Sequence, residues 1–334
     1  MNSSTSSSDN GKLKRGVLIL VTVLVFFSAI EVAMRVILVR ISKDLNRFSE
    51  YPAKAERLHL KGGSNFALIG NSATEAGIDP LLMEHLLRDA GIKDASAEMF
   101  VADASGITTW YYMVKNYFVS SDRVPRYFVI NYSGISLVRD GHLEVGRLAQ
   151  YFTKVDDWRE VILNELSTSG DILEFVLSLC SKTFAFSGRL RDRLLNVAIY
   201  DYKGFARENN QAALDHERMI ASKKGCTVAS TPPDYARFER FLRMIKRSGA
   251  MLIVVAFPTQ LENGESPYAI DPKVRSLVES NGFVFKDLRI AEGLENSMYE
   301  DDIHLSAEGR TIYTRLLAGE IFKTLSELKK DWAL

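Results

Sequence analysis

The chain has 334 residues, which is enough for one α/β domain with a large core or for two small domains. Hydrophobic residues make up 46% and charged residues 25% of it, as is ordinary for a globular protein. The 42 basic and 42 acidic residues balance to a formal net charge of zero, so no basic excess indicates a nucleic-acid partner.

The N-terminal segment predicts a membrane anchor. Residues 2–11 are polar and of low complexity, and we expect residues 1–15 to be a disordered cytoplasmic leader. The stretch GVLILVTVLVFFSAI, residues 16–30, has no charge, and apolar character resumes after Glu31 as far as residue 39. Together these supply about the ~20 residues that a helix needs to cross a bilayer. Because no small-residue cleavage site follows, we predict an uncleaved anchor over residues 16–39.

The charges around the anchor bear on its orientation and on its neighbours. Basic residues precede the span at Lys12, Lys14 and Arg15, but others follow it at Arg35, Arg40, Lys43 and Arg47. We expect a single-pass protein of the inner membrane with its N-terminus inside and its main domain periplasmic or extracellular. Glu31 and Arg35 share a helix face, which favours an ion pair within the helix over a contact with another membrane protein.

After a charged juxtamembrane connector over residues 40–62, short apolar runs alternate with helical patterns. Strands are expected at residues 65–69, 97–102, 126–131, 251–257 and 283–285. Helices are expected after the cap Asp79-Pro80, over 108–118, from Thr231 to Gly249, at 272–280 and from about Ser306 past Phe322. This alternation predicts an α/β domain over residues 63–330, with a parallel sheet flanked by helices on both faces in three flavodoxin-like layers. Ligands of such sheets bind at the carboxyl ends of the strands.

Residues 137–228 do not follow this alternation. Segments such as DILEFVLSLC and RDRLLNVAIYDY are helical in pattern, so we predict a helical insertion that could cap the site. It holds both cysteines, Cys180 and Cys226, whose spacing is not that of metal ligands. One disulfide and two core thiols remain equal alternatives. The basic run at Arg189, Arg191 and Arg193 fits a solvated helix face better than a site for an anionic polymer.

The first predicted strand ends in Gly70-Asn71-Ser72. A serine directly after a buried strand, at a turn toward a helix, exposes its hydroxyl at the edge of the sheet. Nearby backbone N–H groups can then hold an oxyanion. Ser72 is therefore our candidate nucleophile, against the plainer alternative of a helix cap.

The matching base stands just before the last predicted helix, in Asp301-Asp302-Ile303-His304. A histidine there can reach the strand ends, and an acid three residues earlier can orient the imidazole and stabilise its charged form. The other four histidines have no such setting: His59, His85, His142 and His216. The alternatives are a structural histidine and a helix-capping acidic turn.

These two motifs together resemble the SGNH, or GDSL-type, hydrolase superfamily over about residues 63–325, without the insertion. The resemblance assigns Ser72, His304 and Asp301 as the catalytic residues, with no metal and no cofactor. It implies an oxyanion hole formed by the N–H groups of Ser72 and Gly106. Asn131, in Asn131-Tyr132-Ser133-Gly134, is the best candidate for a third donor, although the family's Gly-x-Asn-Asp block is not clearly present. Asn71 also stands where the family commonly has aspartate.

The anchor, the run GNSATEAGIDP and the strand closing in Phe257-Pro258 resemble a membrane-anchored branch of bacterial SGNH proteins. These include relatives of alginate O-acetylation proteins and of the D-alanine-transfer protein of teichoic acid synthesis. The resemblance implies an O-acyltransferase or acetyl esterase acting on a cell-envelope polysaccharide, beside a multi-pass membrane acyltransferase. The alternative is a non-catalytic assembly factor of exopolysaccharide biosynthesis that binds glycan or that membrane partner.

Overall fold

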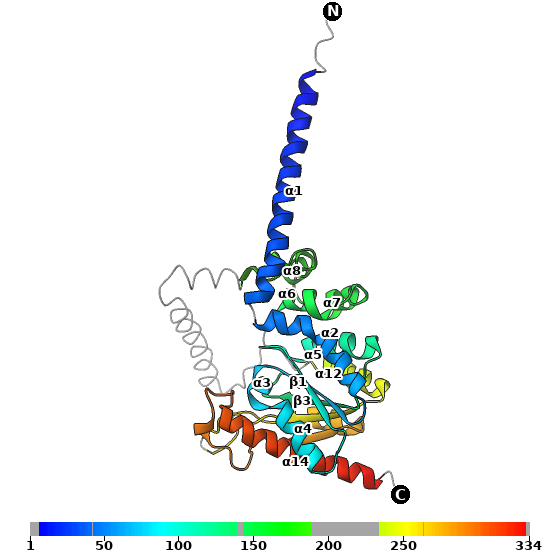
Figure 1. Ribbon diagram of the computed structural model, residues 1–334, viewed down its shortest axis with the longest axis vertical. Helices are drawn as coiled ribbons and strands as arrows, with labels where there is room; N and C mark the ends of the chain where they lie inside the picture. The colour runs from blue at the N-terminus through cyan, green and yellow to red at the C-terminus, as the bar shows by residue number, and fades with distance from the viewer. Residues whose placement is uncertain (1–6, 42, 139–142, 189–233, 263, 332–334) are drawn as a thin grey trace, which may run out of the picture. The chain divides into compact units, whose positions relative to one another are not determined.

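The computed structural model describes residues 7–41, 43–138, 143–188, 234–262 and 264–331 (Figure 1). The chain divides into two compact units. The anchor unit consists of Met1–Arg47, Val145–Gln150 and Leu166–Cys226, and the sheet unit of Phe48–Glu144, Tyr151–Glu165 and Thr227–Leu334. The sheet unit therefore begins before the expected connector ends.

The centre of the sheet unit is a five-stranded sheet in the order β2-β1-β3-β4-β5, in which every pair of neighbours is parallel. Its strands are β1 (Asn65–Gly70), β2 (Ser96–Val101), β3 (Tyr127–Tyr132), β4 (Met251–Ala256) and β5 (Val284–Asp287). The predicted α/β class and all five predicted strands are confirmed. The chain runs from β1 outward to β2 and then to β3 on the other side of β1. The carboxyl ends of β1 and β3 thus form a topological switch point, where such sheets bind ligands.

One face of the sheet is covered by α4 (Pro80–Asp89) and α14 (Ala307–Asp331). Alternate strand residues point to this face because side chains in a strand have a period of two. Phe66, Val129 and Val255 pack there with Met83 of α4 and Leu317 of α14. Burial of this apolar surface is the main force that holds the two helices on the sheet.

The opposite face is covered by α5 (Ile107–Tyr117), α12 (Tyr235–Ser248) and α13 (Pro272–Ser280), as the figure shows for α5 and α12 (Figure 1). Phe118 follows α5 and packs edge-on against Phe100 of β2 and Phe128 of β3. The start of α12 agrees with the sequence only in part, because Asp234 caps the helix while Thr231-Pro232-Pro233 lies outside the described residues. Gly249 ends the helix with φ of +77°, a left-handed conformation that glycine adopts without a steric penalty.

The expected connector, residues 40–62, is instead largely one helix, α2 (Lys43–Lys61). Within the sheet unit its residues Tyr51, Ala55 and Leu58 are fully buried. The Tyr51 hydroxyl accepts a hydrogen bond from Val101 N at 2.9 Å at the end of β2. The charged residues between these positions mask an amphipathic stripe of helical spacing in the sequence.

The anchor unit contains α1 (Ser7–Ile41), α6 (Val145–Arg147), α8 (Ser169–Cys180) and α9 (Lys182–Ala185). Within α1, the segment Lys14–Ala33 is long and apolar enough to cross a membrane, and none of it is buried. The helix already begins at Ser7, inside the leader predicted over residues 1–15. Once a helix is nucleated, each further residue adds a hydrogen bond at little cost, which lets the apolar helix extend into its polar flank.

The predicted insertion, residues 137–228, is helical where the structure describes it, but it is not one block. Tyr151–Glu165, with α7 (Trp158–Asn164), belongs to the sheet unit. The segment DILEFVLSLC forms α8 as predicted. The segment RDRLLNVAIYDY, the three arginines from Arg189 to Arg193 and Cys226 lie outside the described residues, so their predictions stay untested. Cys180 is exposed.

Candidate active site

Ser72 is the first residue of a short helix, α3 (Ser72–Gly77), that begins two positions after β1 ends. Asn71 caps this helix, and its side-chain oxygen accepts a hydrogen bond from Ala73 N at 3.1 Å. At the first helical position the Ser72 N–H has no acceptor within the helix. Gly70 is required by close packing, since a Cβ at this position would lie 1.9 Å from the Thr74 hydroxyl oxygen.

His304 lies in a tight loop between β5 and α14. The Glu300 N–H donates to the carbonyl of His304 at 2.8 Å, and the Ser306 N–H donates to that of Met298 at 2.8 Å. The Asp301 carboxylate closes the loop from inside, since one of its oxygens accepts from the N–H groups of Ile303 (2.9 Å) and His304 (2.8 Å). Because Asp301 and His304 are three residues apart, one carboxylate oxygen of Asp301 accepts from the loop backbone while the other contacts the His304 ring.

The structure brings Ser72, His304 and Asp301 together although 232 residues separate the serine from the histidine. His304 Nε2 lies 2.9 Å from Ser72 Oγ, and His304 Nδ1 lies 2.7 Å from Asp301 Oδ2. In the tautomer with its proton on Nδ1, His304 donates to Asp301 and accepts from the Ser72 hydroxyl. This is the geometry in which a histidine can take the proton of an attacking serine.

Solvent exposure differs along this chain of hydrogen bonds. The His304 side chain is 28% exposed and that of Asp301 51% exposed, so the acid end faces water. Partial burial of Asp301 disfavours its charged form. Hydrogen bonds from the His304 ring and from the N–H groups of Ile303 and His304 outweigh this effect and lower the pKa of Asp301. Asp301 therefore keeps its charge, which orients the imidazole.

Contacts between α14 and the α3–α4 connection hold the two halves of the site in register. The Arg310 guanidinium donates to the carbonyl of Ile78 at 3.0 Å, and Asp79 N donates to the Thr314 hydroxyl at 3.0 Å. Gly77 permits a close approach here, because a Cβ would lie 2.4 Å from the ring of Phe257. These contacts explain how two distant segments meet with hydrogen-bond accuracy.

Gly106, the predicted oxyanion donor, caps the start of α5 in extended conformation, after the loop that follows β2. In this loop Ala104 has φ of +48°, an uncommon and strained value for a residue with a Cβ. The Ser105 hydroxyl donates to the carbonyl of Ala102 at 2.5 Å. The role of Gly106 as an oxyanion donor stays a prediction.

Trp110 connects the loop before Gly106 to the turn that carries Ser72, a role that the sequence does not reveal. Its indole N–H is shared between the Ser105 hydroxyl at 2.9 Å and the carbonyl of Gly70 at 3.1 Å, and the side chain is fully buried. In the sequence this tryptophan is one more apolar residue of a predicted helix. Nothing there distinguishes it from a core residue.

Asn131, the predicted third donor, is buried in β3 and is 1% exposed. Its side-chain oxygen accepts from the Tyr313 hydroxyl of α14 at 2.8 Å. Within the described part of the chain its amide nitrogen has no hydrogen-bond partner, although a buried N–H normally has one. Tyr313 thereby orients the amide, and this second positioning contact could not be read from the sequence either.

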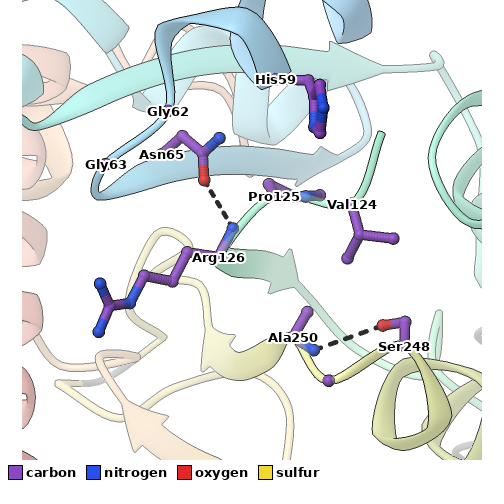
Figure 2. Close-up of a pocket in the computed structure, with 10 residues that line it drawn as sticks. His59, Gly62, Gly63, Asn65, Val124, Pro125, Arg126, Ser248 and Ala250 are labelled. Atoms are coloured by element: carbon purple, nitrogen blue, oxygen red, sulfur yellow. Dashed lines mark hydrogen bonds between the residues drawn. The ribbon is translucent and has the colours of Figure 1, made fainter. Parts of the chain in front are cut away.

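A pocket of about 350 Å³ lies at the amino ends of β1, β3 and β4, on the edge of the sheet opposite to Ser72 (Figure 2). Asn65 crosses its floor, accepting from Arg126 N at 2.6 Å. Ser248 accepts from Ala250 N at 3.4 Å and donates to the carbonyl of Ile245 at 2.7 Å, so its hydroxyl serves a helix end. The pocket is separate from Ser72, since parallel strands carry their amino and carboxyl ends on opposite edges.

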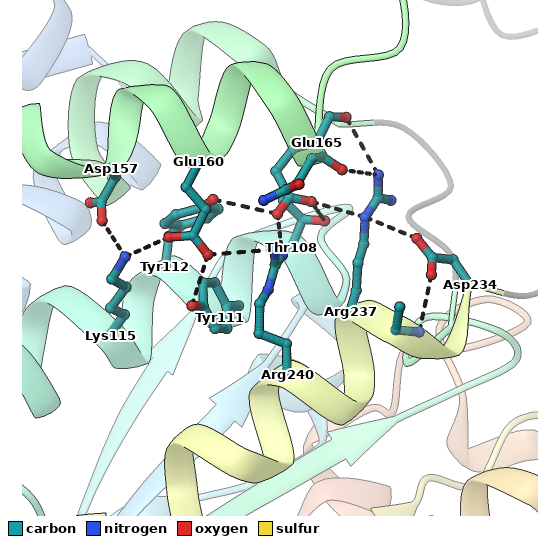
Figure 3. A network of polar contacts seen from close by, with 12 residues as sticks. Thr108, Tyr111, Tyr112, Lys115, Asp157, Glu160, Glu165, Asp234, Arg237 and Arg240 are labelled. Carbon is teal, nitrogen blue, oxygen red and sulfur yellow. Dashed lines mark hydrogen bonds and ion pairs between the residues drawn. The ribbon is translucent and has the colours of Figure 1, made fainter. Parts of the chain in front are cut away.

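A second charged cluster, which we name the Glu165 network, links α5, α7 and α12 (Figure 3). The Glu165 side chain is fully buried, with Arg237 Nε at 2.9 Å, and it also pairs with Arg240. Burial, and then the negative charges of Glu165 and Glu160, raise the pKa of Tyr112 far above its usual value. The network also includes Thr108, Tyr111, Lys115 and Asp157.

Among the residues that the structure describes, no three His, Cys, Asp or Glu side chains are grouped as metal ligands would be.

Comparison with known proteins finds likenesses of structure only. No protein-family profile matches the sequence, and no curated protein matches it. An alpha/beta hydrolase enzyme from the metagenome of Lake Arreo aligns with 78% of this chain and 96% of its own, at 12% identity and a TM-score of 0.38. A catalytic mutant of an acetylxylan esterase from Geobacillus stearothermophilus gives the same coverages and TM-score at 13% identity. A GDSL-like lipase from Bacteroides thetaiotaomicron covers 83% of this chain and 99% of its own, at 11% identity and 0.34.

The last two are an acetylxylan esterase and a GDSL-like lipase by name, the kind of protein that the sequence resemblance names.

Proposed function

We propose that the protein is a membrane-anchored acyl-transfer enzyme that works outside the cytoplasm through Ser72, His304 and Asp301. One observation carries this proposal, the continuous contact from the Ser72 hydroxyl through the His304 ring to the Asp301 carboxylate, at 2.9 and 2.7 Å. A separation this short supports a working nucleophile over the alternative of an assembly factor that merely retains the fold.

In the proposed reaction, the Ser72 hydroxyl attacks the carbonyl carbon of an acyl donor while His304 Nε2 takes its proton. The new Oγ–C bond gives a tetrahedral oxyanion, which the N–H groups of Ser72 and Gly106 and the Asn131 amide stabilise. When this collapses, the leaving group departs with the proton from His304 and the acyl group stays on Ser72. An acceptor hydroxyl then attacks the acyl carbon and loses its proton to His304. The Oγ–C bond breaks, the acyl group stays on the acceptor, and Ser72 Oγ takes the proton back from His304.

The acceptor decides between a transferase and an esterase, and we propose a hydroxyl of a cell-envelope polysaccharide. The apolar helix α1 supports a substrate that is assembled at the membrane. We infer that the helix is a retained anchor with its N-terminus inside, and not a cleaved signal, because Glu31 within it forms hydrogen bonds to the rest of the anchor unit. A multi-pass membrane acyltransferase would supply the acyl group on the outer side.

Replacement of Ser72 by alanine tests the proposal. We expect hydrolysis of a chromogenic acetyl ester by purified Ser72→Ala protein to fall by roughly 10⁴-fold or more, because removal of a serine nucleophile disables the whole relay. A fluorophosphonate probe should label the wild type and not the variant. Ser276→Ala, an exposed serine of α13, is the matched control and should keep both activity and labelling.

Unchanged activity and labelling in Ser72→Ala would show that the nucleophile is elsewhere. The choice between transferase and esterase needs a second measurement, the ratio of acylated oligosaccharide to free acid with wild-type enzyme. A transferase yields acylated sugar even in water, whereas an esterase yields acid alone.

A further inference from the structure

The anchor unit carries an apolar surface besides α1. On α8 the exposed side chains follow helical spacing, with Leu173 59%, Val176 44% and Leu177 39% exposed. Cys180 is exposed at the end of the same stripe, and Phe184 of α9 is 40% exposed. We name these five residues the α8 surface.

The other side of α8 packs within the protein. Phe175 and Ser178 are fully buried. The exposed face of a helix on a soluble domain is normally polar, whereas on α8 this face carries the three apolar side chains beside Glu174. The α8 surface therefore lacks an apolar environment in the described part of the chain.

Contacts within the anchor unit determine where the α8 surface lies along the axis of α1. The Glu31 carboxylate accepts from the Ser181 hydroxyl at 2.8 Å and from the N–H groups of Lys182 (2.6 Å) and Thr183 (3.2 Å), the first residues of α9. Ser181 in turn accepts from Phe184 N at 3.0 Å and caps α9. The start of α9 is thereby bound to α1 two residues before the apolar segment ends at Ala33.

The remaining helices of the unit transmit this placement to α8. Gly146 of α6 lies so close to α9 that a Cβ would be 2.3 Å from the carbonyl oxygen of Ala185. The Gln150 amide donates to the carbonyl of Ser178 in α8. Since a helix rises 1.5 Å per residue, the Glu31 contact lies about 3 Å from the end of the apolar segment. Although apolar residues continue to residue 39, the charges of Glu31 and Arg35 favour this level as the boundary between the hydrocarbon and the headgroups, because charged groups are costly deeper in a bilayer.

We infer that the α8 surface rests in the interface of the bilayer that α1 spans, so that its occupant is lipid. The argument depends on the proposed membrane anchor. It is supported by continuity with α1, whose side chains at this end are also apolar and exposed, as Phe27 at 63% and Val32 at 64% show. Burial of apolar side chains in the interface stabilises such a helix on a membrane.

Cys180 allows a direct test with the full-length protein in phospholipid nanodiscs. A polarity-sensitive fluorophore is attached to Cys180 in a Cys226→Ser background and is exposed to lipids with a quencher near the headgroups, and separately to iodide in water. We expect quenching by the lipid to be several-fold stronger than for a control label at Ser276→Cys in a Cys180→Ser, Cys226→Ser background. Quenching by iodide should be correspondingly weaker.

A third label separates this inference from the proposed anchor. Val25→Cys, in the middle of the apolar segment, should be quenched by a lipid whose quencher lies deep in the acyl chains. Quenching at Val25 with none at Cys180 overturns the inference and keeps the anchor. Absence of lipid quenching at both positions overturns both. Protection of Cys180 from lipid and iodide alike also overturns the inference, because the surface is then covered by protein.

Discussion

Two charged clusters in the sheet unit are built from similar groups, yet they differ in what those groups face. In the Glu165 network a fully buried carboxylate is surrounded by Arg237, Arg240 and two hydroxyl groups. At the candidate site the carboxylate of Asp301 is half exposed and has a single ring nitrogen as its side-chain partner, with His304 leading on to Ser72.

The difference teaches where chemistry can occur in this fold. In the Glu165 network each carboxylate oxygen of Glu160 and Glu165 has a cationic or hydroxyl partner, so neither carboxylate is left to take a proton from a substrate. In the candidate site the chain of hydrogen bonds leads to the Ser72 hydroxyl, just after the carboxyl end of β1. The dense charges of the Glu165 network therefore join helices, whereas the short chain of hydrogen bonds leads to the proposed nucleophile.

The largest expected effect in this comparison belongs to Asp301→Asn. The amide cannot accept the ring proton as a carboxylate does, so the imidazole loses the tautomer that serves Ser72. We expect kcat/KM on an acetyl ester to fall by roughly 10³- to 10⁴-fold. Asp302→Asn, at the neighbouring exposed acid, should change kcat/KM little. Equal losses in both variants would contradict the assignment of Asp301.

Glu165→Gln should show the opposite pattern, with stability lost and activity kept. The neutral amide leaves two partly buried guanidinium groups without their carboxylate, at a cost of about 3 kcal/mol in the free energy of unfolding. Denaturant unfolding in detergent measures it. Glu239→Gln, on the exposed side of α12, removes only a surface pair and should cost less than about 0.5 kcal/mol. Full stability of Glu165→Gln would refute the structural role of the network.

Tyr313→Phe tests the oxyanion side of the site. Loss of the hydroxyl leaves the buried Asn131 oxygen unpaired and should cost about 1–2 kcal/mol of stability. If the Asn131 amide donates to the oxyanion, kcat should also fall by about tenfold, with little change in KM. Tyr127→Phe, on the same face of β3, is the control. A loss of stability without any loss of kcat would remove Asn131 from the proposed mechanism.

The smallest expected effect is the contribution of Asp301 to the pH dependence of stability. Because the pKa of Asp301 is lowered in the native protein, its ionised form stabilises the fold at pH values above the ordinary carboxyl pKa. This contribution is lost as the pH falls through the lowered pKa. Unfolding midpoints of wild type and Asp301→Asn, measured from pH 7 down to pH 3, should therefore converge. A constant difference over this range would argue against the coupling.

The sequence predicts the main features of the sheet unit because they are local. Strand runs such as MLIVVAF, the cap Asp79-Pro80 and the glycine at 249 each specify their element without reference to distant residues. The motif positions of Ser72 and His304 follow from the same pattern, since residues after parallel strands gather at one edge. Even the α2 stripe is present in the sequence, although the charges between its members conceal it.

What the sequence cannot supply depends on contacts between segments far apart in the chain. Three such contacts are the Trp110 N–H shared between two loops, the hydrogen bond from Tyr313 to Asn131, and the hydrogen bonds that join Glu31 to the start of α9. The types of these residues alone predict only a core or a membrane helix. Ser72 and His304 could be named from their places in the alternation of strands and helices. Only tertiary packing decided that their atoms lie 2.9 Å apart, because α14 must first be fixed on α3 and α4 by its own buried contacts.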